Sequence, residues 1–205
     1  PGGPMEPPGK DFDAERLRFV ANNVAYIRRL DAGHSKQAPA GFVRAALAKA
    51  TPQAVIMYLG GALPGQLMKA SWALGVSPMF YGMSIVAGEV TVKVAGEKAR
   101  GLAISQVVPY PWSESDPTTR EYRRLAEAAK VPVGYYSFEG YLNALVLLEA
   151  LRRSGRELTR PRLLATLRGM KMRVAGVDLD YAANGVTGSR FVELVQVTHE
   201  GRFVR

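Results

Sequence analysis

From residue 39 onward, the apolar residues of this chain alternate between helical spacing and short continuous runs. Pro39 to Ala50 places apolar residues three and four apart, and Thr51-Pro52 then ends the helix that this spacing predicts. Residues 54–59 are continuously apolar, which predicts a short strand. A helix followed by such a strand is typical of a parallel sheet buried on both faces, so the pattern predicts an α/β fold.

The same alternation continues toward the C-terminus and predicts the remaining elements. Expected helices cover residues 64–74, 86–94, 118–130, 138–153 and 159–168. Expected strands cover residues 78–82, 101–108 and 190–197, with a last short segment at 202–204. In the helix over 118–130, the spacing predicts an inner side formed by Tyr122, Leu125 and Ala129. Strand 190–197 alternates apolar and polar residues, so one of its faces should meet water.

The N-terminal part is less regular. Residues 1–11 are rich in proline and glycine and are expected to be disordered. Residues 13–30 fit a helix capped by Asp13, because Leu17, Val20, Val24 and Ile27 recur at helical spacing. A strand through residues 24–27 is the alternative.

The loops that follow the predicted strands hold the residues with the clearest binding chemistry. In open α/β sheets small molecules bind beyond the carboxyl ends of the strands. The first such loop is Gly60-Gly61-Ala62, where glycine permits either close approach to a ligand or simply a tight turn. The second contains Ser84, which is either a donor to a ligand oxygen or an ordinary surface serine.

An aromatic segment precedes the helix over 138–153, which ends at Gly155. We interpret Tyr135 and Tyr136 as a loop in which one ring contacts a ligand and the other belongs to the core. Tyr110 and Trp112 either form the rim of the same cleft or pack in the interior. Glu139 is better explained as a cap of its own helix than as a ligand contact.

Composition limits the function classes. With 205 residues, the chain is long enough for one domain or two small lobes. An apolar fraction of 47% and a charged fraction of 22% are those of a globular protein, and no run of 18 apolar residues occurs. The absence of cysteine and the presence of only two histidines argue against thiolate catalysis, metal sites and cofactors that depend on them. No signal-peptide pattern opens the chain and its first residue is not methionine, so we expect a processed chain or a fragment.

The net charge of +9 is unevenly distributed. Eight basic residues and one acid, Glu157, lie between Arg152 and Arg173. Such a stretch suits nucleic acid or anionic lipid, or it is the solvated face of two helices. Because no nucleic-acid motif accompanies it, we interpret it as a solvated face and expect no nucleic-acid partner.

Residues for catalysis are not evident. The segment from Gly82 to Val86 is similar to a nucleophile elbow, but residue 86 is not the second glycine that this motif requires. Phosphate-binding glycine motifs are absent. Asp178 and Asp180 would share a face on a strand, yet no histidine lies near them, so we interpret them as acids that flank a turn. We therefore expect a protein that is not an enzyme.

Five local patterns, in their order and spacing, carry a resemblance to a known family. They are residues 55–61, residues 80–84, residues 95–101 leading to Pro109, residues 139–155, and residues 184–189 before the last strands. Over residues 35–205 the chain resembles the second half of a type I periplasmic binding protein of the leucine/isoleucine/valine-binding group. The resemblance implies a parallel-sheet lobe whose first-lobe partner is largely missing. It divides the chain into an unmatched segment 1–34, an α/β ligand-binding lobe 35–134, and hinge-returning helices with C-terminal strands 135–205.

The resemblance also implies a function. Members of this family bind a small polar ligand in a cleft between two lobes and deliver it to the membrane permease of an ABC importer. A periplasmic location follows from the same resemblance. The ligand-binding residues would be Gly61, Ala62, Ser84, Tyr135 and Tyr136.

Two of these positions depart from the family pattern. Ala62 stands where amino-acid receptors tend to have an aromatic residue, and Ser84 stands where the family often has an acid that pairs with the ligand ammonium. A neutral hydroxyl cannot pair with an ammonium as a carboxylate does. A carboxylate, an aromatic acid or an amide is therefore a better expected ligand than a plain amino acid.

Two alternatives differ in class. The first is a small α/β enzyme that uses the same strand-end loops. The second is a truncated product without a role of its own, in which the helices over 39–50 and 138–153 leave apolar faces uncovered. Uncovered faces predict aggregation or dimerisation.

Overall fold

The computed structural model describes residues 52–205. The expectations for residues 1–11, 13–30 and 39–50, and for the unmatched segment 1–34, lie outside this range. The described residues belong to one compact unit, residues 36–205. The predicted boundary between residues 134 and 135 stays a prediction.

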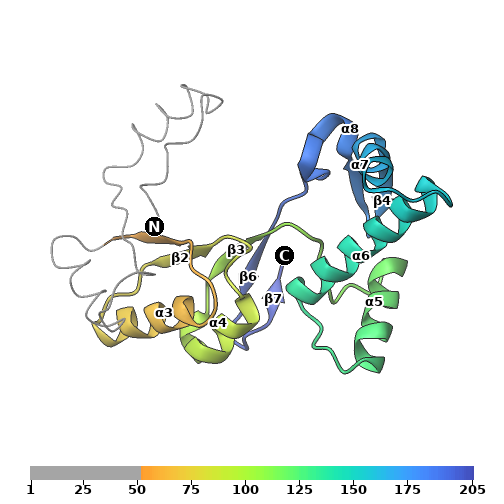
Figure 1. The fold of residues 1–205 in the computed structure, drawn as a ribbon. Coiled ribbons are helices and arrows are strands. Elements are labelled where there is room, and N and C mark those ends of the chain that lie inside the picture. The colour runs from red at the N-terminus through yellow and green to blue at the C-terminus, as the bar shows by residue number, and fades with distance from the viewer. Residues whose placement is uncertain (1–51) are drawn as a thin grey trace, which may run out of the picture. The chain divides into compact units, whose positions relative to one another are not determined.

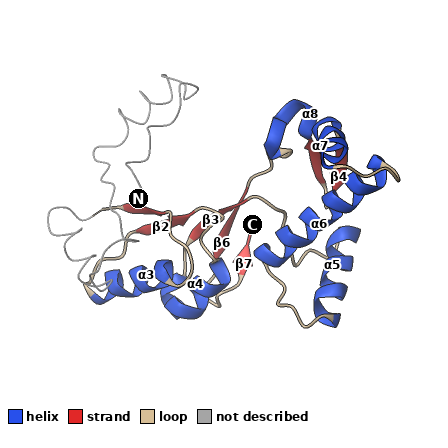
Figure 2. Cartoon of the chain, in the orientation of Figure 1, coloured by secondary structure: helices blue, strands red, loops and turns tan. Residues whose placement is uncertain are grey.

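Apart from a hairpin over residues 171–180, the longer strands and helices follow one another along the chain as the apolar pattern predicts, with shorter strands (Figures 1 and 2). The strands are β1 Ala54–Met57, β2 Met79–Gly82, β3 Ala103–Gln106, β4 Lys171–Val174, β5 Val177–Asp180, β6 Glu193–Val197 and β7 Phe203–Val204. The helices are α3 Leu63–Ala73, α4 Gly88–Ala95, α5 Pro117–Ala128, α6 Tyr135–Ser154, α7 Arg160–Gly169 and the short α8 Tyr181–Asn184, with 3₁₀ turns η1 Gly96–Ala99 and η2 Gly185–Thr187.

The main sheet has the strand order β1-β2-β3-β6-β7. The first three strands are parallel, and β6 and β7 extend the sheet in the antiparallel sense. Each parallel step is made through a helix, as a parallel sheet requires, because its strands cannot be joined by a tight turn. The predicted α/β fold with a parallel-dominated sheet is confirmed.

Helices α3 and α4 cover one face of this sheet. The residues that point toward them include Met57, Phe80 and Ile104, each at most 4% exposed. The two helices approach closely at Gly65 in α3, where an added Cβ would lie 2.8 Å from the Cβ of Val94 in α4. This side of the sheet is therefore a closely packed core.

The opposite face of the sheet remains exposed. Ile56 in β1 is 77% exposed and Leu194 in β6 is 69% exposed, and Met79 and Tyr81 in β2 are also exposed. Strand residues alternate between the two faces, so one row of side chains is buried and the next is not. The expectation of a sheet buried on both faces is wrong for residues 52–205, because helices cover only one of its faces there. The expectation of a wet face on β6 is confirmed, although that face carries Leu194 as well as Gln196.

Helix α5 begins at Asp116, whose carboxylate accepts the backbone N–H of Thr119 at 2.8 Å. Its buried stripe is Thr119, Tyr122 and Ala126. The prediction for Tyr122 is confirmed, but Leu125 and Ala129 are exposed. Both sets of positions are three and four apart, so helical spacing alone does not choose between them. The packing of Tyr122 against Phe138 of the helix over residues 135–154 goes with burial of the side that carries residues 119, 122 and 126.

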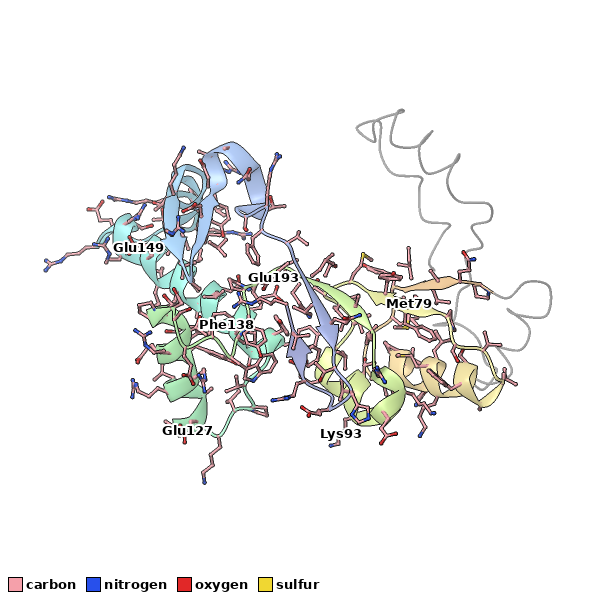
Figure 3. All side chains as sticks on the ribbon, turned by 180° about the vertical axis from the view of Figure 1, so that it is seen from behind. Met79, Lys93, Glu127, Phe138, Glu149 and Glu193 are labelled. Carbon is pink, nitrogen blue, oxygen red and sulfur yellow. The ribbon has the colours of Figure 1, made fainter. Side chains whose placement is uncertain are left out.

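Helix α6 begins three residues earlier than predicted. Tyr135 and Tyr136 form its first turn instead of a preceding loop. Its buried face includes Phe138, which is fully buried and whose ring centroid lies 4.7 Å from that of Tyr122 in α5 (Figure 3). The two helices are thus joined through aromatic side chains.

A hairpin follows α7 that the sequence pattern did not reveal. Strands β4 and β5 pair in the antiparallel sense around Ala175-Gly176, both of which have positive φ. Two consecutive residues of positive φ suit a tight two-residue hairpin. Alanine there gives a weaker signal than asparagine or glycine. Asp178 and Asp180 lie on β5 and pair with Arg173 and Lys171 of β4, at 3.0 and 2.7 Å.

Part of the basic stretch is neutralised within the fold. Glu149 accepts hydrogen bonds from both Arg152 and Arg153 on the last turns of α6. The bonds from these two arginines lower the pKa of Glu149 to about 2. The same stretch contains the pairs at β4 and β5, which agrees with a solvated, internally paired face.

Candidate functional site

The two strand-end loops leave the sheet at the same edge. In the parallel pair of β1 and β2, Met57 is aligned with Gly82. Gly61 follows Met57 by four residues, and Ser84 follows Gly82 by two. The carboxyl ends of neighbouring parallel strands point in one direction, so both loops lie at one end of the sheet.

The loop after β1 owes its shape to glycine. Gly61 has a φ of 61°, in the left-handed region where side chains other than glycine are disfavoured. Ala62 then starts α3, and its carbonyl oxygen accepts the N–H of Gln66 at 3.1 Å. Gly61 is exposed and Ala62 is half-buried, and the added Cβ of either Gly60 or Gly61 would meet open space. The backbone of this loop is therefore accessible.

The loop after β2 is a tight turn that presents Ser84. The N–H of Val86 is donated to the carbonyl oxygen of Met83 at 2.8 Å. Gly82 is needed beneath this turn, because an added Cβ would lie 2.9 Å from the side chain of Val86. Ser84 is half-buried, and within residues 52–205 its hydroxyl has no hydrogen-bond partner.

Tyr136 joins the start of α6 to this second loop. Its hydroxyl donates to the carbonyl oxygen of Ile85 at 2.7 Å, and Ile85 follows Ser84 directly. The ring is 49% exposed. Burial raises the pKa of Tyr136, and the nearby carboxylates of Glu89 and Glu139 raise it further. The structure thus brings Tyr136 to the loop of Ser84, although the two lie some fifty residues apart in sequence.

Tyr135 has a different environment. It is 3% exposed, and its ring meets Trp112 and Phe203 edge to face at centroid distances of 5.5 and 5.9 Å. Burial raises the pKa of its hydroxyl, which finds no hydrogen-bond partner among the described residues. Of the two neighbouring tyrosines, Tyr135 belongs to the core and Tyr136 faces the loop.

Trp112 and Tyr110 serve packing rather than the rim of a cleft. The Trp112 ring stacks on Phe203 at a centroid distance of 5.7 Å, and Tyr110 lies 5.1 Å from Trp112. The Tyr110 hydroxyl donates to the backbone carbonyl of Phe203 at 3.2 Å. This aromatic cluster ties β7 to the segment after β3.

No local sequence pattern distinguishes Glu89 from other surface acids. This residue is the second of α4, and its carboxylate accepts the backbone N–H of Tyr135 at 3.1 Å. Glu139, which the sequence suggested as a cap of α6, lies beyond the first turn of that helix. A contact between residues 89 and 135 depends on the fold and leaves no local pattern.

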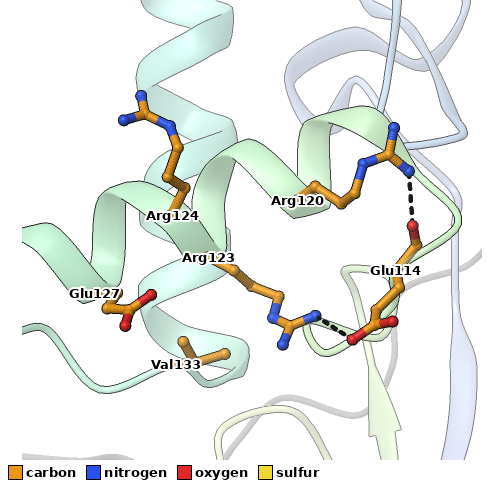
Figure 4. A pocket seen from close by; sticks show the side chains of 6 residues that line it. All are labelled: Glu114, Arg120, Arg123, Arg124, Glu127 and Val133. Atoms are coloured by element: carbon orange, nitrogen blue, oxygen red, sulfur yellow. Dashed lines mark hydrogen bonds and ion pairs between the residues drawn. The ribbon is translucent and has the colours of Figure 1, made fainter.

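Two surface hollows lie away from the strand-end loops. An open hollow of about 650 Å³ is lined by α5 and its neighbours Glu114 and Val133 (Figure 4). Its three arginines are already engaged: Arg120 donates to the carbonyl of Glu114, Arg123 pairs with Glu114, and Arg124 pairs with Glu121. A smaller, mostly apolar groove of about 260 Å³ lies between α5 and α6. Neither contains a residue of the strand-end loops.

Residues 52–205 show neither a metal-ligand cluster nor a membrane-spanning helix. No cluster of three or more potential metal ligands is present in this range. None of its helices has both the length and the apolar character needed to cross a membrane.

The comparisons with known proteins agree with this architecture. The model of the periplasmic binding protein family matches residues 18–202. A search of the curated proteins found no match. A substrate-binding periplasmic protein from Ralstonia solanacearum is 28% identical, with a TM-score of 0.74 over 82% of this chain and 49% of that one. An extracellular ligand-binding receptor from Verminephrobacter eiseniae is 27% identical, with a TM-score of 0.70 over 82% of this chain and 48% of that one.

A third solved structure extends the similarity in fold. It is a branched chain amino acid ABC transporter protein from Thermus thermophilus with bound valine, 18% identical, with a TM-score of 0.73 over 93% of this chain and 55% of that one. The chain thus spans about half the length of the solved structures that it matches. The fold is that of a type I periplasmic binding protein, and the chain belongs to the periplasmic binding protein family.

Proposed function

We propose that this chain is the ligand-contacting second half of a solute receptor for an ABC-type importer, located in the periplasm. Two observations carry the proposal: the loop of Gly61 and Ala62 leaves the sheet at the same edge as the loop of Ser84, and Tyr136 at the start of α6 is bonded to the second of these loops. Family membership supports solute binding as the class of function. The loops would bind one side of the ligand, and the half that the chain does not span would close over the other.

The chemistry of the three segments suggests the kind of ligand. The accessible backbone at Gly61 suits close approach of a polar group, the Ser84 hydroxyl can donate to an oxygen, and the exposed ring of Tyr136 offers an apolar surface. A small carboxylate, an aromatic acid or an amide satisfies these groups. An amino acid remains within the class, and the valine of the Thermus thermophilus structure is a suitable probe for it.

A titration tests the proposal. Because half of the receptor fold is absent, isothermal titration of the chain with benzoate, acetamide and L-valine should show no micromolar binding. Saturation-transfer NMR at millimolar probe concentration should show weak binding. The substitutions Ser84→Ala and Tyr136→Ala should reduce the transferred signal several-fold.

Ser115→Ala is the matched control, because Ser115 is an exposed serine in the loop before α5. It should leave the signal unchanged. Micromolar binding by the chain alone would contradict the half-receptor proposal. Transfer that is absent for every probe, or equal in all variants, would contradict the assignment of the loops.

A further inference from the structure

The first turn of α6 is stabilised from outside the helix. Its N-cap position is Gly134, which has no side chain to accept the free N–H groups of the first turn. The N–H of Tyr135 is instead donated to Glu89 Oε1 at 3.1 Å, from a residue 46 positions earlier in the chain. A carboxylate at the N-terminal end of a 20-residue helix is also favoured by the helix dipole.

Gly134 makes room for this carboxylate. A Cβ built on Gly134 would lie 2.6 Å from Glu89 Oε1 and 3.2 Å from its carboxyl carbon. The φ of Gly134 is −175°, which any residue can adopt. A methyl group at residue 134 would therefore displace the Glu89 carboxylate without straining the backbone.

The start of α4, which carries Glu89, is closely packed. Glu89 follows Gly88, where an added Cβ would lie 2.8 Å from the ring of Phe203. Phe203 is buried and stacks on Trp112, which in turn contacts Tyr135. The start of α4 and the start of α6 are thus packed against the same aromatic cluster, and the carboxylate bridges between them.

The bridge has a consequence for the neighbouring residue. Tyr136 is the next residue in α6, and its hydroxyl reaches the carbonyl oxygen of Ile85 at 2.7 Å. Two bonds therefore tie the first turn of α6 to the segment 85–89, one through the Tyr135 amide and one through the Tyr136 hydroxyl. Without the first bond, the Tyr136 hydroxyl would make the one remaining hydrogen bond between this turn and residues 85–89.

We propose that Glu89 is a positioning residue of the candidate ligand site: its carboxylate holds the first turn of α6 against the loop after β2 and so places Tyr136 beside Ser84. The hydrogen bond from the Tyr135 amide to Glu89 is present in the structure of this chain. Its importance for a ligand rests on the proposed function.

Amide hydrogen exchange of the full chain, followed by NMR, tests the contact directly. The substitution Glu89→Ala should increase the exchange rate at the Tyr135 amide about tenfold or more, because it removes a charged acceptor. Glu89→Gln keeps an acceptor of the same shape and should restore part of the protection. Gly134→Ala should reproduce the effect of Glu89→Ala, because its methyl group displaces the carboxylate.

Glu97→Gln is the control, since Glu97 is an exposed acid in η1. It should leave the Tyr135 amide unchanged. Equal protection in Glu89→Ala and the native chain would overturn the proposal. So would equal exchange rates in Glu89→Ala and Glu89→Gln, because these would indicate that the acceptor has no part in the protection. The exchange measurement needs no ligand, so it can succeed or fail independently of the saturation-transfer test.

Discussion

Single hydroxyl and carboxylate groups fix the geometry around the start of α6. The buried hydroxyl of Tyr122 accepts the N–H of Gly134 at 3.0 Å and lies 2.6 Å from Ser137 Oγ. On the other side of the same turn, Glu89 accepts the N–H of Tyr135. Two consecutive backbone amides are therefore satisfied by side chains from two different helices, α5 and α4.

The substitution Tyr122→Phe should lower the free energy of unfolding by about 1–2 kcal/mol, because it leaves the buried N–H of Gly134 without a partner. Urea denaturation followed by circular dichroism measures this. The matched control is Tyr141→Phe, whose hydroxyl makes no hydrogen bond to the described residues; it should change stability by less than about 0.5 kcal/mol. Equal losses in the two variants would contradict the role given to the Tyr122 hydroxyl.

At the residue scale, the sequence predicts a role correctly where that role depends on a property of the residue type itself. Gly61 was selected because glycine permits unusual backbone geometry, and it does have a positive φ. The sequence predicts that one of the rings of Tyr135 and Tyr136 belongs to the core and that the other contacts a ligand. It does not predict which tyrosine takes which role. That choice depends on the register of α6, which begins earlier than the sequence indicated.

Helices pack against one another through close backbone approach at glycine as well as through their apolar stripes. Gly65 in α3 lies against α4, and an added Cβ would be 2.8 Å from the Cβ of Val94 and 3.0 Å from the carbonyl oxygen of Thr91. Gly140 in α6 is also helical, yet an added Cβ there would meet nothing within 4 Å. The two glycines look alike in sequence and differ only in their surroundings.

Alanine substitutions at these glycines should therefore have opposite effects. Gly65→Ala should destabilise the chain by about 1–2 kcal/mol, because overpacking between α3 and α4 outweighs the better helix propensity of alanine. Gly140→Ala should stabilise it by about 0.5–1 kcal/mol, because alanine loses less backbone entropy on folding. Thermal or urea denaturation of both variants measures the difference, and effects of the same sign would show that the α3–α4 contact is not tight.

The order of elements could be predicted because the apolar pattern is local. The helix predicted from residue 159 is α7, and the Thr159 side chain caps it. Asp116 caps α5 two residues before the start predicted at residue 118. The β4–β5 hairpin was missed because Ala175 adopts a positive φ that alanine rarely takes.

At the scale of the whole molecule, the sheet carries an exposed apolar face. Ile56 and Leu194 are each more than two-thirds exposed, and β1 has one paired neighbour, β2, among the described strands. An apolar face beside an open strand edge favours association with another chain. In the solved structures of similar fold, the matched region is only about half of the protein.

We expect the isolated chain to self-associate as its concentration rises. Size-exclusion chromatography with light scattering measures this, and the double variant Ile56→Lys/Leu194→Lys should shift the balance toward the monomer. Glu127→Lys, an exposed change on α5, serves as the charge control. A compact monomer at every concentration would count against an uncovered face, and with it against a truncated product.

The sequence by itself determined the α/β class and the order of the elements apart from the β4–β5 hairpin, because spacing, caps and glycines act over a few residues. It also predicted the strand-end loops as the place of ligand binding. Only the tertiary structure decided which tyrosine faces the loop, that Glu89 meets the start of α6, and that one face of the sheet is bare in residues 52–205. Those features depend on which segments pack together over distances of about fifty residues or more, and that packing is set by the three-dimensional arrangement of the chain rather than by any local pattern.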